Sequence, residues 1–474
     1  MDEFVIKSNT LKKYNGKGEN IVIPEDVTRI GESAFMHCES LTSITIPDRV
    51  TTIRKNAFTL CTNLTSIMLP NSLPKIAKCT FSQCKNLKSI KIPDGVASIG
   101  GSAFSGCERL TNITLPDSIT RIEERAFYKC KSLKNITIPD GVVFIGAGAF
   151  KDCENLTSIT IPNEVTKIDE STFANCKGLT NISIPDSVTA IGEGAFIGTP
   201  WLENKRSECP VVIVKGILID AHDCSGDVKI PDGVTVIGEG AFQHCISLTS
   251  VTIPDSVTEI KERAFQDCLN LISITLPESI AEIGMGAFSG CTSLSGVTIP
   301  KSVNVIQART FEGCTSLTDI VIPDGVTKIY SYAFSNCTSL TGINLPNGIT
   351  EIGDGVFSGC TSLSSVTIPK SVTEIDCRAF RGCTSLTSIA LPENLIQINM
   401  QAFSNCTSLE SIAFPDSLRT ILWYAFSGCT GLTSVTIPDD IAIFYKKAFW
   451  GCENISISYK GNIYTNENID DIKP

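Results

Sequence analysis

Cysteine is the residue type in this chain with the most evident capacity for chemistry, because the 474 residues include 21 cysteines. Seventeen of them recur every 23 residues, in one series from Cys38 to Cys176 and another from Cys245 to Cys452. Zinc sites need ligands that converge on one point, often from close C-x2-C pairs. A series with one cysteine per 23 residues sets the thiols in a line. We therefore predict no metal site.

Two histidines lie beside cysteines of this series, as His37–Cys38 and His244–Cys245. A thiol in contact with an imidazole can act as a nucleophile. Adjacent residues usually point apart, however, and the other cysteines of the series lack a neighbouring histidine. The sequence also lacks a P-loop, a dinucleotide-binding fingerprint and a G-x-S-x-G elbow. It predicts no catalytic residue, no cofactor and no enzyme activity.

The simplest role for the regular cysteines is to fill buried space as small apolar side chains. Four cysteines, Cys79, Cys209, Cys224 and Cys377, lie outside the series and are expected at the surface. The sequence leaves open whether Cys209 and Cys224 pair with each other. Many unpaired thiols favour a reducing cytoplasm or an anaerobic exterior.

Prolines and phenylalanines repeat with the same period of 23, which is typical of a solenoid, a propeller or an array. Residues 247–268, SLTSVTIPDSVTEIKERAFQDC, represent one unit. Residues 250–253 alternate polar and apolar, which predicts a strand that ends at Pro254. Residues 262–268 suit a short turn of α- or 3-10 helix on the return path. The positions predicted to face the interior are Leu248, Val251, Ile253, Val257, Ile260, Ala264, Phe265 and Cys268.

The stretch LTSVTIPDSV matches the L-x-x-L-x-L frame, so the unit resembles a leucine-rich repeat. The fuller wording, IPxxVTxIGxxAFxGCTSLTSVTIP, is similar to the BspA-like class known in surface antigens of bacteria and some protozoa. This resemblance implies an α/β-type repeat solenoid with mostly strand and irregular content. It would be a right-handed superhelix of about twenty turns, with one parallel β-strand per turn. Ser256, or Gly in other units, stands where the usual motif has Asn or Cys, so the amide ladder of ordinary leucine-rich repeats should be absent.

The chain begins its pattern twice, because residues 4–24 and 211–231 align without a gap. This predicts two leucine-rich repeat blocks. Block 1–207 has the starter motif 4–24, eight repeats and a capping stretch at 198–210, where Trp201 and Leu202 would cover the core. Block 208–474 has the starter motif 211–231, ten repeats and a C-terminal cap. The unbroken register favours one continuous solenoid, although a kink at 198–230 stays open.

Two sets of residues are candidates for binding. Threonine recurs two positions before the proline, with serine two positions earlier, on the outward side of the expected strands. Bulky aromatic residues break the repeat near the C-terminus, where they would form either a cap or a binding patch. The candidates are Ser250, Thr252, Thr275 and Thr298 in the first set and Trp423, Tyr424, Phe444 and Tyr445 in the second.

The chain has 39 basic and 50 acidic residues, a net charge of −11 that we interpret as spread along the whole length. This argues against nucleic acid and anionic membranes as partners. No apolar run is long enough to span a bilayer, and a monomer is expected. The expected partner is a protein of unknown identity.

The resemblance implies adhesion to host or neighbouring-cell proteins at the cell surface. The start MDEFVIKSNTLKKYNGKGEN lacks a secretory signal, so a soluble cytoplasmic interaction module is the alternative. A structural or ice-surface-binding array is the remote alternative.

Overall fold

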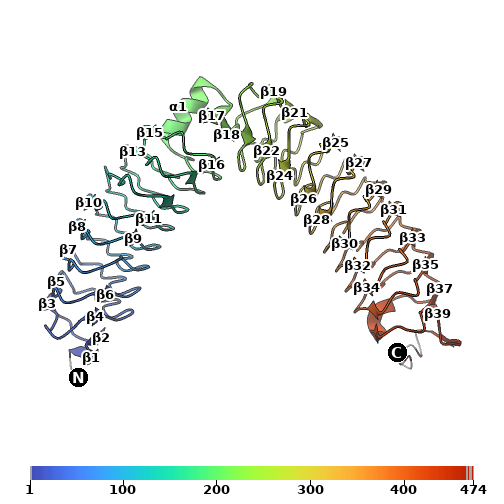
Figure 1. Ribbon diagram of the computed structural model, residues 1–474, viewed down its shortest axis with the longest axis horizontal. Helices are drawn as coiled ribbons and strands as arrows, with labels where there is room; N and C mark the ends of the chain where they lie inside the picture. The colour runs from blue at the N-terminus through green and yellow to red at the C-terminus, as the bar shows by residue number, and fades with distance from the viewer. Residues whose placement is uncertain (1–2, 466–467, 469–471, 473–474) are drawn as a thin grey trace. The chain divides into compact units, whose positions relative to one another are not determined.

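The computed structural model describes residues 3–465, 468 and 472. It is built almost entirely from stacked turns of 23 residues, and the described chain divides into two compact units, residues 1–215 and 216–474. Figure 1 shows the stacked turns within each unit. The predicted repeat solenoid with parallel strands is confirmed. Among the described residues, no helix is long and apolar enough to cross a bilayer.

Nearly every regular turn contributes a strand shortly before its proline, the turn before Pro139 being an exception, and these strands form the first strand ladder. They pair in parallel with a shift of one unit, so Ser250 faces Ser273 and Thr252 faces Thr275. In the first unit these strands are β3 (Asn20–Val22), β5 (Ser43–Thr45), β7 (Ser66–Ile67), β8 (Ser89–Lys91), β10 (Asn112–Thr114), β13 (Ser158–Thr160) and β15 (Asn181–Ser183). In the second they are β19 (Gly226–Lys229), β21 (Leu248–Thr252), β23 (Ser273–Thr275), β25 (Gly296–Thr298), β27 (Asp319–Val321), β29 (Gly342–Asn344), β31 (Ser365–Thr367), β33 (Ser388–Ala390), β35 (Ser411–Ala413) and β37 (Ser434–Thr436).

The expectation of one strand per turn is incomplete, because the return path holds a second, shorter strand. These strands form the second strand ladder, also parallel, in which Glu259 faces Glu282 and Ile260 faces Ile283. In the first unit they are β4 (Arg29–Ile30), β6 (Thr52–Ile53), β9 (Ser98–Ile99), β11 (Arg121–Ile122), β12 (Phe144–Ile145), β14 (Lys167–Ile168) and β16 (Ala190–Ile191). In the second they are β20 (Val236–Ile237), β22 (Glu259–Ile260), β24 (Glu282–Ile283), β26 (Val305–Ile306), β28 (Lys328–Ile329), β30 (Glu351–Ile352), β32 (Glu374–Ile375), β34 (Gln397–Ile398), β36 (Thr420–Ile421) and β38 (Ile443–Phe444).

Stretches that differ from the regular turn begin and end the arrays. Strands β1 (Phe4–Lys7) and β2 (Thr10–Tyr14) form an antiparallel hairpin at the start of the first unit, and β39 (Ser456–Tyr459) and β40 (Asn462–Tyr464) form one near the end of the second. The other elements are α1 (Pro200–Glu208), β17 (Val212–Val214), β18 (Ile217–Asp220) and the 3-10 helix η1 (Lys446–Phe449).

The segment expected to be helical, residues 262–268, consists of tight turns instead. Arg263 and Asp267 adopt left-handed backbone conformations, with φ of 53° and 57°, which a helix cannot contain. Within these turns the Cys268 N–H donates to the Phe265 carbonyl. The 3-10 helix η1 is the one helical return segment among the described turns.

The interior is filled by the positions predicted to be apolar, and all eight of those in residues 247–268 are buried. The phenylalanines stack from turn to turn, with ring centroids 4.8 to 5.9 Å apart in the two units. Tyr14 continues the stack at the start of the first unit, 5.3 Å from Phe35. Each phenylalanine ring is therefore buried by contact with the rings of the neighbouring turns.

Serine hydroxyls take the place of the missing amide ladder. The hydroxyl of Ser256 donates to the Val234 carbonyl of the preceding turn at 2.7 Å. Ser118, Ser187, Ser279 and Ser417 repeat this bond at 2.6 to 2.8 Å. A small hydroxyl thus satisfies the buried carbonyl that an asparagine would otherwise reach.

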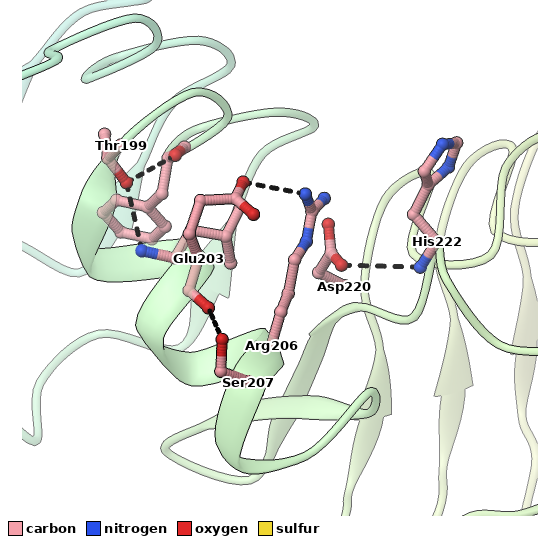
Figure 2. A network of polar contacts seen from close by, with 8 residues as sticks. Thr199, Glu203, Arg206, Ser207, Asp220 and His222 are labelled. Carbon is pink, nitrogen blue, oxygen red and sulfur yellow. Dashed lines mark hydrogen bonds and ion pairs between the residues drawn. The ribbon is translucent and has the colours of Figure 1, made fainter.

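Helix α1 lies at the end of the regular turns of the first unit. Thr199 caps it, because its hydroxyl accepts from the Leu202 N–H at 3.2 Å while Pro200 takes a first-turn position. Glu203 accepts from Arg206 at 2.9 Å one turn further on (Figure 2). Leu202 is buried, and the Trp201 ring lies 4.7 Å from Phe196. The Trp201 ring therefore packs against Phe196, the last phenylalanine of the stack in this unit.

Candidate binding surfaces

The thiols of the regular series are largely enclosed in the interior, where burial raises the pKa of Cys176 and Cys360 to about 12. The thiolate is the form that reacts and binds metals, so these thiols are poor nucleophiles and ligands at neutral pH. Among the residues that the structure describes, no group of three or more His, Cys, Asp or Glu side chains could hold a metal ion.

All 21 cysteines are in the thiol form, and no disulfide joins Cys209 to Cys224. Cys209 is exposed, and Cys79 and Cys377 are half-buried, as expected for positions outside the series. The expectation that Cys224 lies at the surface is wrong, since it is 6% exposed. The reason is a shorter turn: 21 residues separate Cys224 from Cys245, so Cys224 takes the interior position of the second starter motif.

The two histidines next to cysteines of the series do not share a hydrogen bond with them. His37 and His244 have left-handed backbones, with φ of 62° and 60°. The exposed His244 ring lies 3.4 Å from an Asp267 carboxylate oxygen. The thiol of Cys245 donates instead to the Ala221 carbonyl at 3.2 Å. Imidazole and thiol therefore have different partners.

The threonine candidates lie where the sequence places them, on the outward side of the first strand ladder. Thr252, Thr275 and Thr298 are all exposed, while the residues beside them in the strands, such as Val251, are buried. Strands β21, β23 and β25 are neighbours in one parallel sheet, so the three threonines belong to consecutive strands. We call Thr252, Thr275 and Thr298 the threonine column.

Ser250, the fourth candidate on this face, already forms a hydrogen bond within the protein. Its hydroxyl donates to the Asp227 carboxylate at 2.6 Å, and the Thr249 hydroxyl donates to the same oxygen at 2.9 Å. These two bonds hold the pKa of Asp227 below its ordinary value, with Ser250 making the larger contribution. The face therefore has a fixed carboxylate at its N-terminal edge, beside the threonine column.

The C-terminal aromatic candidates separate into a surface group and an interior residue. Trp423 is 44% exposed, and its ring lies 4.8 Å from Tyr445 and 6.3 Å from Tyr424. Trp450, at 65% exposed, meets Tyr424 edge-on at 6.2 Å. We call Trp423, Tyr424, Tyr445 and Trp450 the aromatic patch.

Phe444 does not belong to this surface. It is buried in β38, opposite Ile421, and lies 6.1 Å from Phe449 of the stack. The hairpin β39–β40 supplies further buried side chains at this end, Ile457 and Tyr459. Trp423 and Trp450 thus lie largely at the surface, while Phe444 is part of the core at this end.

One polar cluster was missed by sequence reasoning, although it surrounds a tyrosine that breaks the repeat. The Tyr332 hydroxyl donates to Asp354 at 3.0 Å and accepts from Arg378 at 3.3 Å. Arg309 lies over the Tyr332 ring at 5.2 Å. Gly355 makes room for this ring, because a Cβ there would lie 2.3 Å from Tyr332 Cε1. The signal available in the sequence was the succession of Arg309, Tyr332, Gly355 and Arg378 at intervals of 23.

Comparison with known proteins identifies the repeat. The model for the BspA type leucine rich repeat region matches residues 5–123, 97–212, 222–341 and 327–456. No curated protein matches.

Two solved structures show similar sequences. A leucine-rich repeat protein from Bacteroides ovatus is 30% identical over 89% of this chain and 98% of that chain, with a TM-score of 0.42. A leucine rich cell surface protein from Faecalibacterium prausnitzii is 27% identical over 77% of this chain and 92% of its own, with a TM-score of 0.34. Because the family model covers most of the sequence, the chain belongs to the BspA-type leucine-rich repeat family.

Proposed function

We propose that the chain is a non-catalytic scaffold that binds a protein partner through the first strand ladder, in adhesion to host or neighbouring-cell proteins. Leucine-rich repeat proteins are typically protein-interaction scaffolds, which supports the general role. The adhesive role is supported by membership of the BspA-type family. A scaffold of this kind needs a preformed surface rather than reactive groups.

The observation that carries the proposal is the exposed threonine column on paired strands. Parallel pairing fixes neighbouring threonines in one register, so their positions are set before any partner arrives. A rigid surface loses little conformational entropy on binding. Each threonine offers a methyl group and a hydroxyl, and equivalent contacts add over consecutive turns.

A soluble intracellular interaction module is the second candidate. It is favoured by the 21 cysteines, all in the thiol form, because proteins of oxidising compartments usually contain disulfides instead. The same binding face would serve this role, with a different partner. Locating the native protein by fractionation of its own cells distinguishes the two: recovery from the cell exterior supports adhesion, and recovery from the cytosol supports the intracellular role.

The test of the binding face begins with a partner that has been captured on the immobilised chain, identified by mass spectrometry and purified. We expect the triple substitution Thr252→Lys, Thr275→Lys and Thr298→Lys to weaken its binding by about tenfold or more, measured by biolayer interferometry. The matched control is Thr327→Lys, Thr350→Lys and Thr373→Lys. These threonines are also exposed in the second unit but precede the second strand ladder, so the control should bind normally.

The aromatic patch is the competing site. Aromatic anchors commonly dominate protein interfaces, so the double substitution Trp423→Ala and Tyr445→Ala is measured beside the two triple variants. If this double variant loses binding with its thermal stability intact, while the Thr252, Thr275 and Thr298 variant binds normally, the threonine column is not the site. An equal loss in both triple variants would also count against it.

A further inference from the structure

The charges are not distributed as the sequence interpretation assumed. Residues 1–215 contain 25 basic and 23 acidic residues, and residues 216–474 contain 14 and 27, so the net charges are +2 and −13. Residues 49–93 contain eight basic residues and no acidic one. The expectation of negative charge along the whole length is therefore wrong, and the first unit has a locally basic region.

Part of this basic region lines a hollow where the second strand ladder is interrupted. The turn between β6 and β9 contributes only an isolated bridge, Ile76 to Ile99. Pro74 lies at the start of this turn's short segment. At the equivalent position Thr51 has a backbone N–H that donates to the Thr28 carbonyl of the preceding turn, and proline lacks this donor. A cavity of about 630 Å³ lies over this turn.

The lining of the hollow combines small residues with cations. Ala77 and Gly100 occupy the position that carries Arg54 and Glu123 in the flanking turns, which leaves space between these longer side chains. Lys75 and Lys78 add two further cationic side chains to the lining. The volume lies within the usual range of ligand sites, about 300 to 1,000 Å³. We call the cavity lined by Arg54, Lys75 and Lys78 the basic hollow.

The acidic residues in the lining do not neutralise these three cations. Glu32 pairs with Lys55 at 3.2 Å, and Glu123 pairs with Arg121 at 2.8 Å. Among the described residues, no ion pair is formed by the basic side chains of Arg54, Lys75 and Lys78. Three cations around one hollow, with no anionic partner, raise the local potential and attract negatively charged groups.

We propose that the basic hollow binds the carboxylates of an acidic peptide segment of a partner protein. The choice of a protein segment as the ligand rests on the proposed protein-binding function. A concave site accepts a segment that projects into it and offers two or three carboxylates to the cations. Single-stranded nucleic acid is disfavoured because no aromatic side chain lines the hollow for base stacking. A membrane surface is disfavoured because it cannot enter a hollow of this size.

The test measures binding of a fluorescein-labelled hexaglutamate peptide to the full chain by fluorescence anisotropy. We expect saturable binding that weakens as salt rises, because the contacts are ionic. The double substitution Lys75→Gln and Lys78→Gln should weaken it by about tenfold or more. Both lysines are exposed, so the variant should fold normally. The control is Lys85→Gln with Lys88→Gln, which removes the same charge from the same basic region but outside the hollow.

Three results would overturn the proposal: no saturable peptide binding, an equal loss in both double variants, or tighter binding of a short DNA duplex through Lys75 and Lys78. The peptide test and the test of the proposed function can fail independently of each other. Partner binding that depends on the threonine column can persist when the peptide fails, and this inference alone would then be lost. Peptide binding that depends on Lys75 and Lys78 would survive the failure of the threonine column.

Discussion

The thiol of Cys291 donates a hydrogen bond to the backbone carbonyl of Phe265 in the preceding turn, with Sγ and O 3.1 Å apart. The same carbonyl accepts the Cys268 N–H at 3.3 Å, within its own turn. Fourteen other cysteines of the series make the equivalent bond to a phenylalanine carbonyl among the described residues, such as Cys61 to Phe35 and Cys452 to Phe426. Cysteine therefore both fills the interior and joins successive turns.

The first prediction concerns this bond. Replacing Cys291 with alanine should lower the free energy of unfolding by about 1 to 2 kcal/mol, because it removes a buried donor and leaves a small void. Chemical denaturation followed by circular dichroism measures the change. Cys209→Ala is the control, since Cys209 is exposed and should contribute almost nothing. Equal stabilities of the two variants would contradict a structural role for the thiol.

The second prediction is that alkaline pH unfolds the chain. Burial raises the pKa of interior thiols from 9.0, to about 12 for Cys176 and Cys360, whereas the unfolded thiols ionise near 9. A raised folded-state pKa gives stability that is present below pH 9 and lost as pH rises towards 12. In this window each such thiol lowers the free energy of unfolding by about 1.4 kcal/mol per pH unit, and the losses add over the series.

The measurement is a pH titration from 8 to 12, followed by circular dichroism together with thiolate absorbance in the ultraviolet. Loss of structure and ionisation of the thiols should occur together, at a pH above the ordinary thiol value. Gradual ionisation near pH 9 with the fold intact would show that the interior thiols are accessible to water.

The third prediction gives the order of alkylation in the native state. Cys209 should react first because it is exposed, and Cys79 and Cys377 should follow as half-buried residues. Burial raises the pKa of Cys38 to about 11, so it should react more slowly than its partial exposure suggests. Cys224 should stay unmodified with the interior series. Timed iodoacetamide labelling with peptide mass spectrometry checks the order, and early labelling of Cys224 would contradict its interior position.

The fourth prediction concerns Gly355. Its φ is +60°, and a Cβ there would lie 2.3 Å from the Tyr332 ring. Gly355→Ala should therefore cost about 1 to 2 kcal/mol of unfolding free energy and displace Tyr332 from Asp354. Gly296→Ala is the matched control, because Gly296 lies in β25 and nothing lies within 4 Å of its added Cβ. Thermal denaturation of both variants measures the difference, and equal melting temperatures would argue against the ring contact.

The features that follow from repetition could be predicted from the sequence. Val251 and Ile253 alternate with polar residues over enough positions to reveal a strand, and a period of 23 places Phe265 and Cys268 at the same depth in each turn. The second strand could not be predicted in this way. Glu259–Ile260 is only two residues long, and its pairing depends on the neighbouring turn rather than on its own pattern.

The candidate surfaces were harder to predict than the interior. The outward position of Thr252 follows from strand alternation, but the bond from Ser250 to Asp227 joins two turns and could not be read from one unit. Phe444 is aromatic like its surface neighbours, but it occupies the position of a ladder isoleucine and is buried there. Helix α1 had a usable signal in Thr199–Pro200, which resembles an N-cap followed by a first-turn proline.

The regular interior of the turns also bears on how the gene can change. The pentapeptide GCTSL begins at Gly290, Gly313, Gly359 and Gly382, always at the same point of the turn. Recombination between the codons for Gly290–Leu294 and Gly313–Leu317 would delete 23 residues and restore the pentapeptide at the junction. The cysteine thiol in the restored pentapeptide would still face the phenylalanine carbonyl of the preceding turn. Recombination in the gene can therefore add or remove whole turns while the remaining residues keep their positions within their own turns.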